Sequence, residues 1–284
     1  MGIIQRKKSI VNKNKRTITV NVETYSSAQE VVNDCKARTI TDSCFENQET
    51  TRNKSFTGVE NYQEALDLLR NGYQPTVENL KQALKVNKGI VEKRVKFENN
   101  IHGFAPVVPL ALKGVPNSMV NMTMKPVKLK VLDVYYDMTI SCCTSTSEII
   151  RNGQKVLGAI INLEKQGYRF NLYAVQTYYK NNDADMLCVK VKSSDRPLDL
   201  KRISFPLTHP AFFRVIGFDW YSKCPVAKYR GGYGKAIAYD LNAEERKEFG
   251  KEMFGDGAVY ISCSNVSNET TESLQEVFLN AKHR

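Results

Sequence analysis

Hydrophobic and polar residues follow two different periods in the first part of this chain. From 17 to 22 the sequence Thr-Ile-Thr-Val-Asn-Val alternates β-branched and polar residues, which predicts a strand. The segments 28 to 37 and 62 to 70, and a third that begins near Pro75, carry apolar residues at helical spacing. We therefore expect one strand followed by a mainly helical region.

The second part of the chain alternates between the two periods. Residues 127 to 136 are rich in Val, Leu and Tyr and predict a buried strand, and residues 147 to 166 have the apolar spacing of a helix. Ser145 and Glu148 match the capping box that starts a helix. Later patterns predict three more strands and a final helix, at 168 to 179, 185 to 192, 258 to 263 and 271 to 281.

Two apolar segments lack a clear period because prolines divide them. Ile203 to Trp220 is strongly apolar, but Pro206 and Pro210 interrupt it, so helix and strand both remain open there. Phe104 to Pro116 contains prolines and a glycine at close intervals and is too broken for a central strand or a long helix. We predict that this second segment is a buried connector.

The succession of strand, helix and strand determines the expected fold class. A helical crossover between strands returns the chain to the same edge of a sheet and makes the strands parallel. We therefore predict an α/β fold, with a Rossmann-like, mostly parallel sheet flanked by helices and an N-terminal α-rich extension. Three parts are expected: a flexible basic arm at 1 to 16, a mixed and mainly helical region at 17 to 126, and the α/β domain at 127 to 284.

The composition is typical of a globular protein, with 42% hydrophobic and 25% charged residues. The net charge of +11 favours anionic partners, and more than half of it comes from the basic residues that precede Glu23. The seven cysteines are scattered and form no Cys-x-x-Cys pair, which argues against a disulfide framework and a zinc site. No secretory h-region and no run of about 18 apolar residues is present, so we expect a cytoplasmic protein without membrane contact.

Three oxygen-bearing side chains alternate directly after the strand at 127 to 136: Asp137, Thr139 and Ser141. In a short extended loop, alternate side chains face the same way. One carboxylate and two hydroxyls, with water completing the coordination sphere, suit Mg²⁺ or Mn²⁺. The alternative is that these residues only cap the helix that follows.

With the motif Asp137-Met-Thr139-Ile-Ser141, the chain resembles the von Willebrand factor A family. The metal-ion-dependent adhesion site of that family begins with Asp-x-Ser-x-Ser directly after the first buried strand. The following helix and Glu164-Lys-Gln-Gly-Tyr-Arg-Phe-Asn-Leu172 also look like the family's first helix turning into its second strand. The resemblance covers about residues 127 to 284, and Thr139 departs from the family's serine while keeping the hydroxyl.

The family's metal site also takes a threonine and an aspartate from two later loops. Thr208 and Asp219 lie at suitable positions in this sequence, with Thr177 and Asp256 as competing choices. The resemblance therefore implies a non-enzymatic module for protein-protein interaction, which either holds Mg²⁺ or Mn²⁺ or has a degenerate site. The implied metal ligands are Asp137, Thr139, Ser141, Thr208 and Asp219.

Binding of nucleic acid is the alternative hypothesis. The loop Lys228-Tyr-Arg-Gly-Gly-Tyr-Gly-Lys235 combines positive charges, tyrosines and glycines, as loops that track a phosphate backbone and stack on bases do. The basic arm adds phosphate-neutralising charge, although both segments are also typical of solvated surface. The residues predicted to contact nucleic acid are Lys7, Lys8, Lys13, Lys15, Arg16, Lys228, Tyr229, Arg230, Tyr233 and Lys235.

An enzymatic function is the third hypothesis. Cys142 and Cys143 lie beside the predicted metal site, and a thiol nucleophile would need His209 within hydrogen-bond reach as its base. Buried and unreactive thiols are the alternative. The stretch from Phe104 to Met119 is also similar to bacteriophage proteins without an assigned activity, which implies a phage or mobile-element origin and the host cytoplasm as the location. The oligomeric state stays open.

Overall fold

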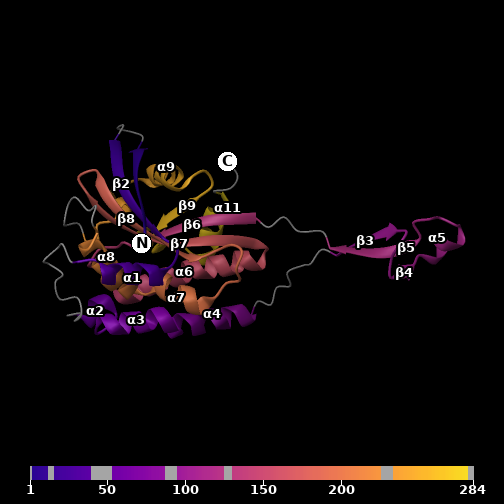
Figure 1. Ribbon diagram of the computed structural model, residues 1–284, viewed down its shortest axis with the longest axis horizontal. Coiled ribbons are helices and arrows are strands. Elements are labelled where there is room, and N and C mark those ends of the chain that lie inside the picture. Colours follow the sequence, from indigo (N-terminus) through magenta and orange to yellow (C-terminus); the bar gives the residue numbers. More distant parts are fainter. Residues whose placement is uncertain are drawn as a thin grey trace.

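The computed structural model describes residues 2–11, 16–39, 53–86, 95–124, 130–224 and 233–280. Its main body contains the strands β1 (Ile3–Val11), β2 (Arg16–Tyr25), β6 (Lys130–Asp137), β7 (Tyr168–Lys180), β8 (Asp183–Lys192) and β9 (Val259–Ser262). These strands form one sheet in the order β1-β2-β8-β7-β6-β9 (Figure 1). The pairs β2 with β8, β7 with β6, and β6 with β9 are parallel, whereas β1 with β2 and β7 with β8 are antiparallel. The sheet is therefore mixed, with mostly parallel pairs.

Helices cover both faces of this sheet. The larger group consists of α1 (Ala28–Ala37), α2 (Lys54–Thr57), α3 (Tyr62–Asn71), α4 (Gln74–Val86), α6 (Thr146–Lys165), α7 (Leu200–Thr208), α8 (Phe218–Ser222), α10 (Cys263–Val266) and α11 (Thr271–Asn280). The 3-10 helix η3 (Ile237–Asp240) and α9 (Ala243–Phe254) cover the opposite face. The predicted α/β class, with a mostly parallel sheet flanked by helices, is thus confirmed. Among the helices of the described residues, none has the length and apolar character needed to cross a bilayer.

Alternation along β8 separates the two hydrophobic cores. Leu187 and Val189 face the larger helix group, whereas Met186 and Cys188 face α9. The strand is buried on both sides, as expected for a strand between two helical layers.

The strand-helix-strand unit predicted around residue 140 is present as β6, α6 and β7. Ser145 caps α6 by accepting a hydrogen bond from the N–H of Glu148 at 3.2 Å. Gly167 follows the helix with a φ of +90°, a conformation that favours glycine, and turns the chain into β7. The crossover makes β6 and β7 parallel neighbours.

The N-terminal residues form an edge strand instead of the predicted flexible arm. β1 pairs with β2 along its whole length, from Ile3 opposite Thr24 to Val11 opposite Arg16. Strand pairing uses backbone N–H and C=O groups, so basic residues do not prevent it, and charged residues are common on edge strands. The prediction for 1 to 16 is corrected for residues 3–11, and residues 12–15 lie outside the described part of the chain.

The boundary predicted after residue 126 does not divide the main body. β2 comes from the predicted N-terminal region and pairs with β8 of the predicted α/β domain. The predicted N-terminal helices are present as α1, α3 and α4, but they bury Val31, Ala65 and Leu80 in the same core as Ile160 of α6. Short-range patterns could not indicate this, because the contacts join residues far apart in the sequence.

The apolar segment from Ile203 to Trp220, for which helix and strand were both open, is helical and buried. It comprises α7, a π-helix (η2, Phe212–Gly217) and α8. Pro206 lies inside α7 and therefore provides no N–H for the helical ladder. Arg214 of η2 contacts the backbone of the loop that follows β6.

Residues 95–124 form a second, small sheet, here called the apolar module (Figure 1). β3 (Val95–Asn100) and β4 (Ala105–Pro106) pair with β5 (Met119–Met124), and α5 (Val108–Leu112) precedes β5. None of residues 97–122 is buried. The prediction of a buried connector is therefore wrong, since Phe104 is 67% and Leu112 84% exposed. Pro106 is accommodated in a two-residue edge strand, Pro109 in the first turn of α5, and Pro116 in a bend before β5.

Candidate functional site

Asp137 is the last residue of β6, between two parallel neighbours. It lies opposite Val175 of β7 and Ser262 of β9. Ligands of α/β proteins commonly bind at the carboxyl ends of parallel strands, where the sequence places the predicted metal site. The Asp137 side chain is completely buried.

Three protein groups donate hydrogen bonds to the Asp137 carboxylate. The backbone N–H of Thr139 donates to Oδ1 at 2.9 Å. The hydroxyls of Thr177 and Tyr260 donate to Oδ2 at 2.9 and 2.6 Å. Burial raises the pKa of Asp137 more than these hydrogen bonds lower it. We call Asp137, Thr139, Thr177 and Tyr260 the Asp137 cluster; it ties β6 to β7 and β9.

The other three predicted metal ligands make different contacts. Ser141 donates its backbone N–H to the hydroxyl of Tyr239 at 2.7 Å. The hydroxyl of Thr208 donates to a carbonyl within α7, and Asp219 pairs with Lys223 at 2.8 Å. Neither Thr208 nor Asp219 thus joins the Asp137 cluster among the described contacts.

These contacts do not fit the five-ligand metal site that the resemblance implies. Both oxygens of Asp137 already accept protein hydrogen bonds, whereas Mg²⁺ or Mn²⁺ needs several oxygen ligands around one accessible point. Of the competing choices, Thr177 is a donor to Asp137, and Asp256 pairs with Lys251 at 2.9 Å on the surface. The described residues also contain no group of three or more His, Cys, Asp or Glu side chains that would hold a metal ion.

The loop after Asp137 makes a tight turn over a buried arginine. The N–H of Thr144 donates to the carbonyl of Ser141 at 3.1 Å and closes the turn. Arg214 donates from Nη2 to the carbonyl oxygens of both residues at 3.0 Å. Cys142 and Cys143 are the central residues of this turn, and both are exposed.

His209, the predicted base for a thiol nucleophile, lies in the core. Its ring centroid is 4.7 Å from that of Tyr73 and 5.5 Å from that of Phe205. Its Nδ1 accepts from the N–H of Ala211 at 3.2 Å, and burial lowers its pKa to about 4. No contact among the described residues joins it to the vicinal cysteines, so the expected nucleophile-base pair is not assembled.

The residues predicted to bind nucleic acid are described only in part. Lys7 donates to the backbone carbonyl of Met253 at 2.5 Å. Tyr233 packs edge-on against three aromatic rings of the core, and Lys235 lies 3.9 Å from Asp240. Lys8 and Arg16 belong to β1 and β2. Lys13, Lys15, Lys228, Tyr229 and Arg230 lie outside the described residues.

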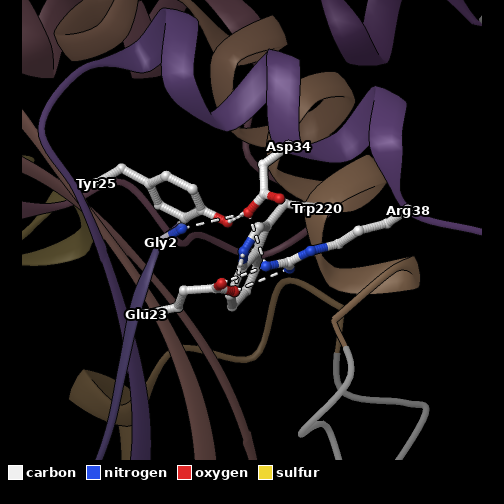
Figure 2. A network of polar contacts seen from close by, with 6 residues as sticks. All are labelled: Gly2, Glu23, Tyr25, Asp34, Arg38 and Trp220. Carbon is white, nitrogen blue, oxygen red and sulfur yellow. Dashed lines mark hydrogen bonds and ion pairs between the residues drawn. The ribbon is translucent and has the colours of Figure 1, made fainter.

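Figure 2 shows a buried ion network that the sequence patterns did not indicate. Arg38 donates to both oxygens of Glu23, and to Oδ2 of Asp34 at 2.7 Å. Nε1 of Trp220 donates to Glu23 at 2.8 Å, and the hydroxyl of Tyr25 donates to Asp34 at 2.6 Å. These bonds connect β2, α1 and α8, and both carboxylates accept hydrogen bonds from protein groups. The backbone N–H of Gly2 also donates to Oδ2 of Asp34, at 3.4 Å. We call Gly2, Glu23, Tyr25, Asp34, Arg38 and Trp220 the Glu23 network.

The sequence patterns above do not identify Arg214 as a residue of the site, although one feature of the sequence points to it. Arg214 is the only charged residue between Ile203 and Phe218, and a lone charge within an apolar run must find buried partners. Its partners are backbone carbonyls, which no sequence pattern identifies.

The sequence of the chain matches the model of a protein family. A family model described as a domain of unknown function (DUF7192) matches residues 8–280. The matched range contains the whole sheet except the first residues of β1, together with the apolar module and the Asp137 cluster. No curated protein and no solved structure matches the chain.

Proposed function

The chain belongs to the DUF7192 family, whose model spans nearly all of it, and we propose that it is a non-enzymatic protein-binding module that associates with a second copy of itself through the apolar module. The observation that carries this proposal is the concentration of exposed apolar side chains on residues 95–124. In the part of the chain that the structure describes, seven of the twelve exposed large hydrophobic residues belong to this segment. Large exposed apolar patches mark interaction surfaces in folded proteins.

The apolar module has too little core of its own to hide these side chains. It contains three short strands and a five-residue helix, and small isolated sheets need packing against another element for stability. Phe97 and Phe104 contact each other with ring centroids 6.3 Å apart, yet they remain 63% and 67% exposed. Covering them would add apolar burial that the module lacks.

A second copy is the partner that the strand edges favour. In the order β3-β5-β4, β3 and β4 are the two edges. β4 is two residues long and contains Pro106, which lacks an N–H for pairing, whereas β3 has six residues and no proline. β3 is therefore the edge that can accept another strand, and antiparallel pairing of two copies of β3 would join two modules with their exposed rings together.

Area and charge agree with this arrangement. A standard interface buries about 800 Å² per partner. A fully buried phenylalanine contributes about 150–250 Å², and about two thirds of that area is still exposed at Phe97 and Phe104. Only Lys96, Glu98 and Lys113 are charged among residues 95–124. The net charge of +11 opposes contact through the rest of the chain.

The von Willebrand A-like resemblance supports the same class of function. The order of β6, the Asp137 loop, α6 and β7, with parallel pairing of the two strands, is what that resemblance implies. The metal-dependent form of the proposal rests on the motif alone, because the contacts of Asp137 do not fit it. Nucleic-acid binding has less support, because Lys7 and Tyr233 make contacts within the protein.

Sedimentation equilibrium tests the proposal. We expect the wild-type protein to form dimers at micromolar concentration, and the triple variant Phe97→Ser, Phe104→Ser and Leu112→Ser to dimerise at least about 100-fold more weakly, since three apolar anchors lose their burial. The matched control is Val277→Ser, which removes an exposed apolar side chain from α11 in the main body and should leave association unchanged.

A wild-type protein that stays monomeric at the highest soluble concentration would contradict the proposal. So would equal dimerisation of the triple variant. Circular dichroism should show the same unfolding temperature for the main body in all three proteins, because the substituted residues of the module and the exposed Val277 all lie outside its core.

A further inference from the structure

The turn between β6 and α6 holds two thiols close together. The Sγ atoms of Cys142 and Cys143 lie 3.9 Å apart, and both side chains are exposed. The N–H of Cys143 donates to Oγ of Ser141 at 3.3 Å. Arg214 fixes the carbonyls at both ends of the turn from below. The pair is therefore presented on a defined backbone.

The other described cysteines differ from this pair. Cys35, Cys188, Cys224 and Cys263 are buried. Burial raises the pKa of Cys35 and Cys263, and raises that of Cys188 to about 12. Because the thiolate is the reactive form, these buried thiols are protected from exchange. Cys44 lies outside the described residues.

We propose that Cys142 and Cys143 form a redox modification site, at which a small disulfide such as oxidised glutathione converts the vicinal thiols into a disulfide ring. The first cysteine, as thiolate, attacks the glutathione disulfide, forms a mixed disulfide and releases one glutathione thiolate. The second cysteine then attacks the protein sulfur of that mixed disulfide and releases the second glutathione. The two cysteines lose two electrons and two protons, and oxidised glutathione becomes two molecules of reduced glutathione.

The geometry makes the ring both accessible and reversible. The two Sγ atoms must approach from 3.9 Å to about 2.05 Å, which requires rotation of both side chains and adjustment of the peptide between them. Adjacent Cα atoms lie only about 3.8 Å apart, below the usual disulfide range of about 4.4–6.8 Å, so the ring is strained. Strained, exposed disulfides are reduced easily and are typical of regulatory sites.

The position of the turn gives the modification a structural consequence. The turn from Ser141 to Thr144 lies in the loop between Asp137 and α6 and ends next to Ser145, the cap of α6. Closing the ring changes the backbone between these two points, while Arg214 and the Asp137 cluster hold the flanking residues. The effect is confined to the exposed turn at the carboxyl end of β6.

Thiol exchange with oxidised glutathione tests the proposal on the full-length protein with Cys44→Ser, so that no thiol of unknown position takes part. After an acid quench and alkylation, mass spectrometry should find a peptide with residues 142 and 143 that has lost two hydrogens and carries no glutathione. In Cys142→Ser and Cys143→Ser, which lack the resolving thiol, the mixed disulfide should persist about tenfold longer or more. Excess reduced glutathione should reopen the ring in the parent protein.

Phenylarsine oxide provides a second measurement that needs no oxidant. Two neighbouring thiols bind the arsenic atom together and release its oxygen as water, so the parent protein should bind one arsenical, and each single variant should lose this binding. A persistent glutathione adduct in the parent protein, or arsenical binding that survives both single substitutions, would overturn the proposal. Serine is close to cysteine in size, and both positions are exposed, so loss of folding would not explain these outcomes.

Discussion

Replacing Arg38 by methionine is expected to destabilise the fold by about 3–5 kcal/mol, the range for breaking a buried ion pair by removal of one partner. Arg38 is the cation between two buried carboxylates: the side chain of Glu23 is 1% exposed and that of Asp34 6% exposed. Without the guanidinium, the indole N–H of Trp220 is the one side-chain donor that Glu23 keeps among the described residues. The carboxylates of Glu23 and Asp34 would then lie close together in the core without their shared cation. Figure 2 shows these two side chains on either side of Arg38.

Urea unfolding followed by circular dichroism measures this effect, and the fluorescence of Trp220, the single tryptophan of the chain, reports on the network itself. Arg70→Met is the matched control. Arg70 also lies at the end of a helix and pairs with an aspartate, but both side chains are more than half exposed, so the expected loss is at most about 0.5 kcal/mol. Equal losses for the two variants would show that the Glu23 network adds no more than a surface pair.

A double variant distinguishes charge repulsion between Glu23 and Asp34 from the lost packing of the Arg38 side chain. Adding Glu23→Gln to Arg38→Met removes one of the two unpaired charges, so part of the lost stability should return. If the double variant is instead less stable by the sum of both single effects, the destabilisation comes from lost packing of the Arg38 side chain.

The elements that the sequence predicts well are those whose signals are local. The α6 helix carries its own cap at Ser145 and its own end at Gly167, and the strand of 168 to 179 follows immediately. The buried segment at Ile203 to Trp220 shows the limit of this approach. Its apolar side chains face the core all round, so no amphipathic period distinguishes helix from strand, and its helical state depends on packing.

The predictions for the N-terminal part failed because β2 has a distant partner strand. β1 pairs with β2, its neighbour in the sequence, and β2 pairs with β8, more than 150 residues later, which brings both strands into the sheet. Glu23 occupies a polar position in the alternating pattern of β2, which predicts exposure, yet α1 and α8 cover it. For the apolar module the error is the reverse. Its hydrophobic composition predicts burial, whereas residues 97–122 are not buried within the chain.

The spacing of the sequence indicates only part of the Asp137 cluster. Asp137 and Thr139 do come together at the carboxyl end of β6, as their spacing indicates. Tyr260 could not be foreseen, because β9 lies about 120 residues later and pairs directly with β6. Thr208 and Asp219 were implied as ligands by the order of motifs in the resembled family. In the structure they lie in α7 and α8, where they have other partners.

Replacing Asp137 by alanine is expected to cost about 3 kcal/mol or more, because it removes the common acceptor of the cluster. The hydroxyls of Thr177 and Tyr260 and the N–H of Thr139 would lose their partner in a completely buried position. Each buried donor left unsatisfied costs about 1–3 kcal/mol. Urea unfolding of the variant gives the value. Asp133→Ala is the matched control on the same strand, and should cost less than about 1 kcal/mol because Asp133 is only half-buried and accepts one side-chain bond from Asn171.

The same variants decide between a structural and a metal-binding role for Asp137. With both carboxylate oxygens already bonded within the protein, 10-fold steps in MgCl₂ or MnCl₂ at constant ionic strength should shift the unfolding temperature of the wild type and Asp133→Ala equally little, since a ligand stabilises only by binding the folded state. The opposite outcome is a metal-dependent rise in the unfolding temperature of the wild type and of Asp133→Ala, but not of Asp137→Ala. That result would require the cluster to open and Asp137 to bind a metal ion. In that case the hydrogen bonds of Thr177 and Tyr260 describe only the metal-free state, and the motif from Asp137 to Ser141 would have the role that its resemblance implies.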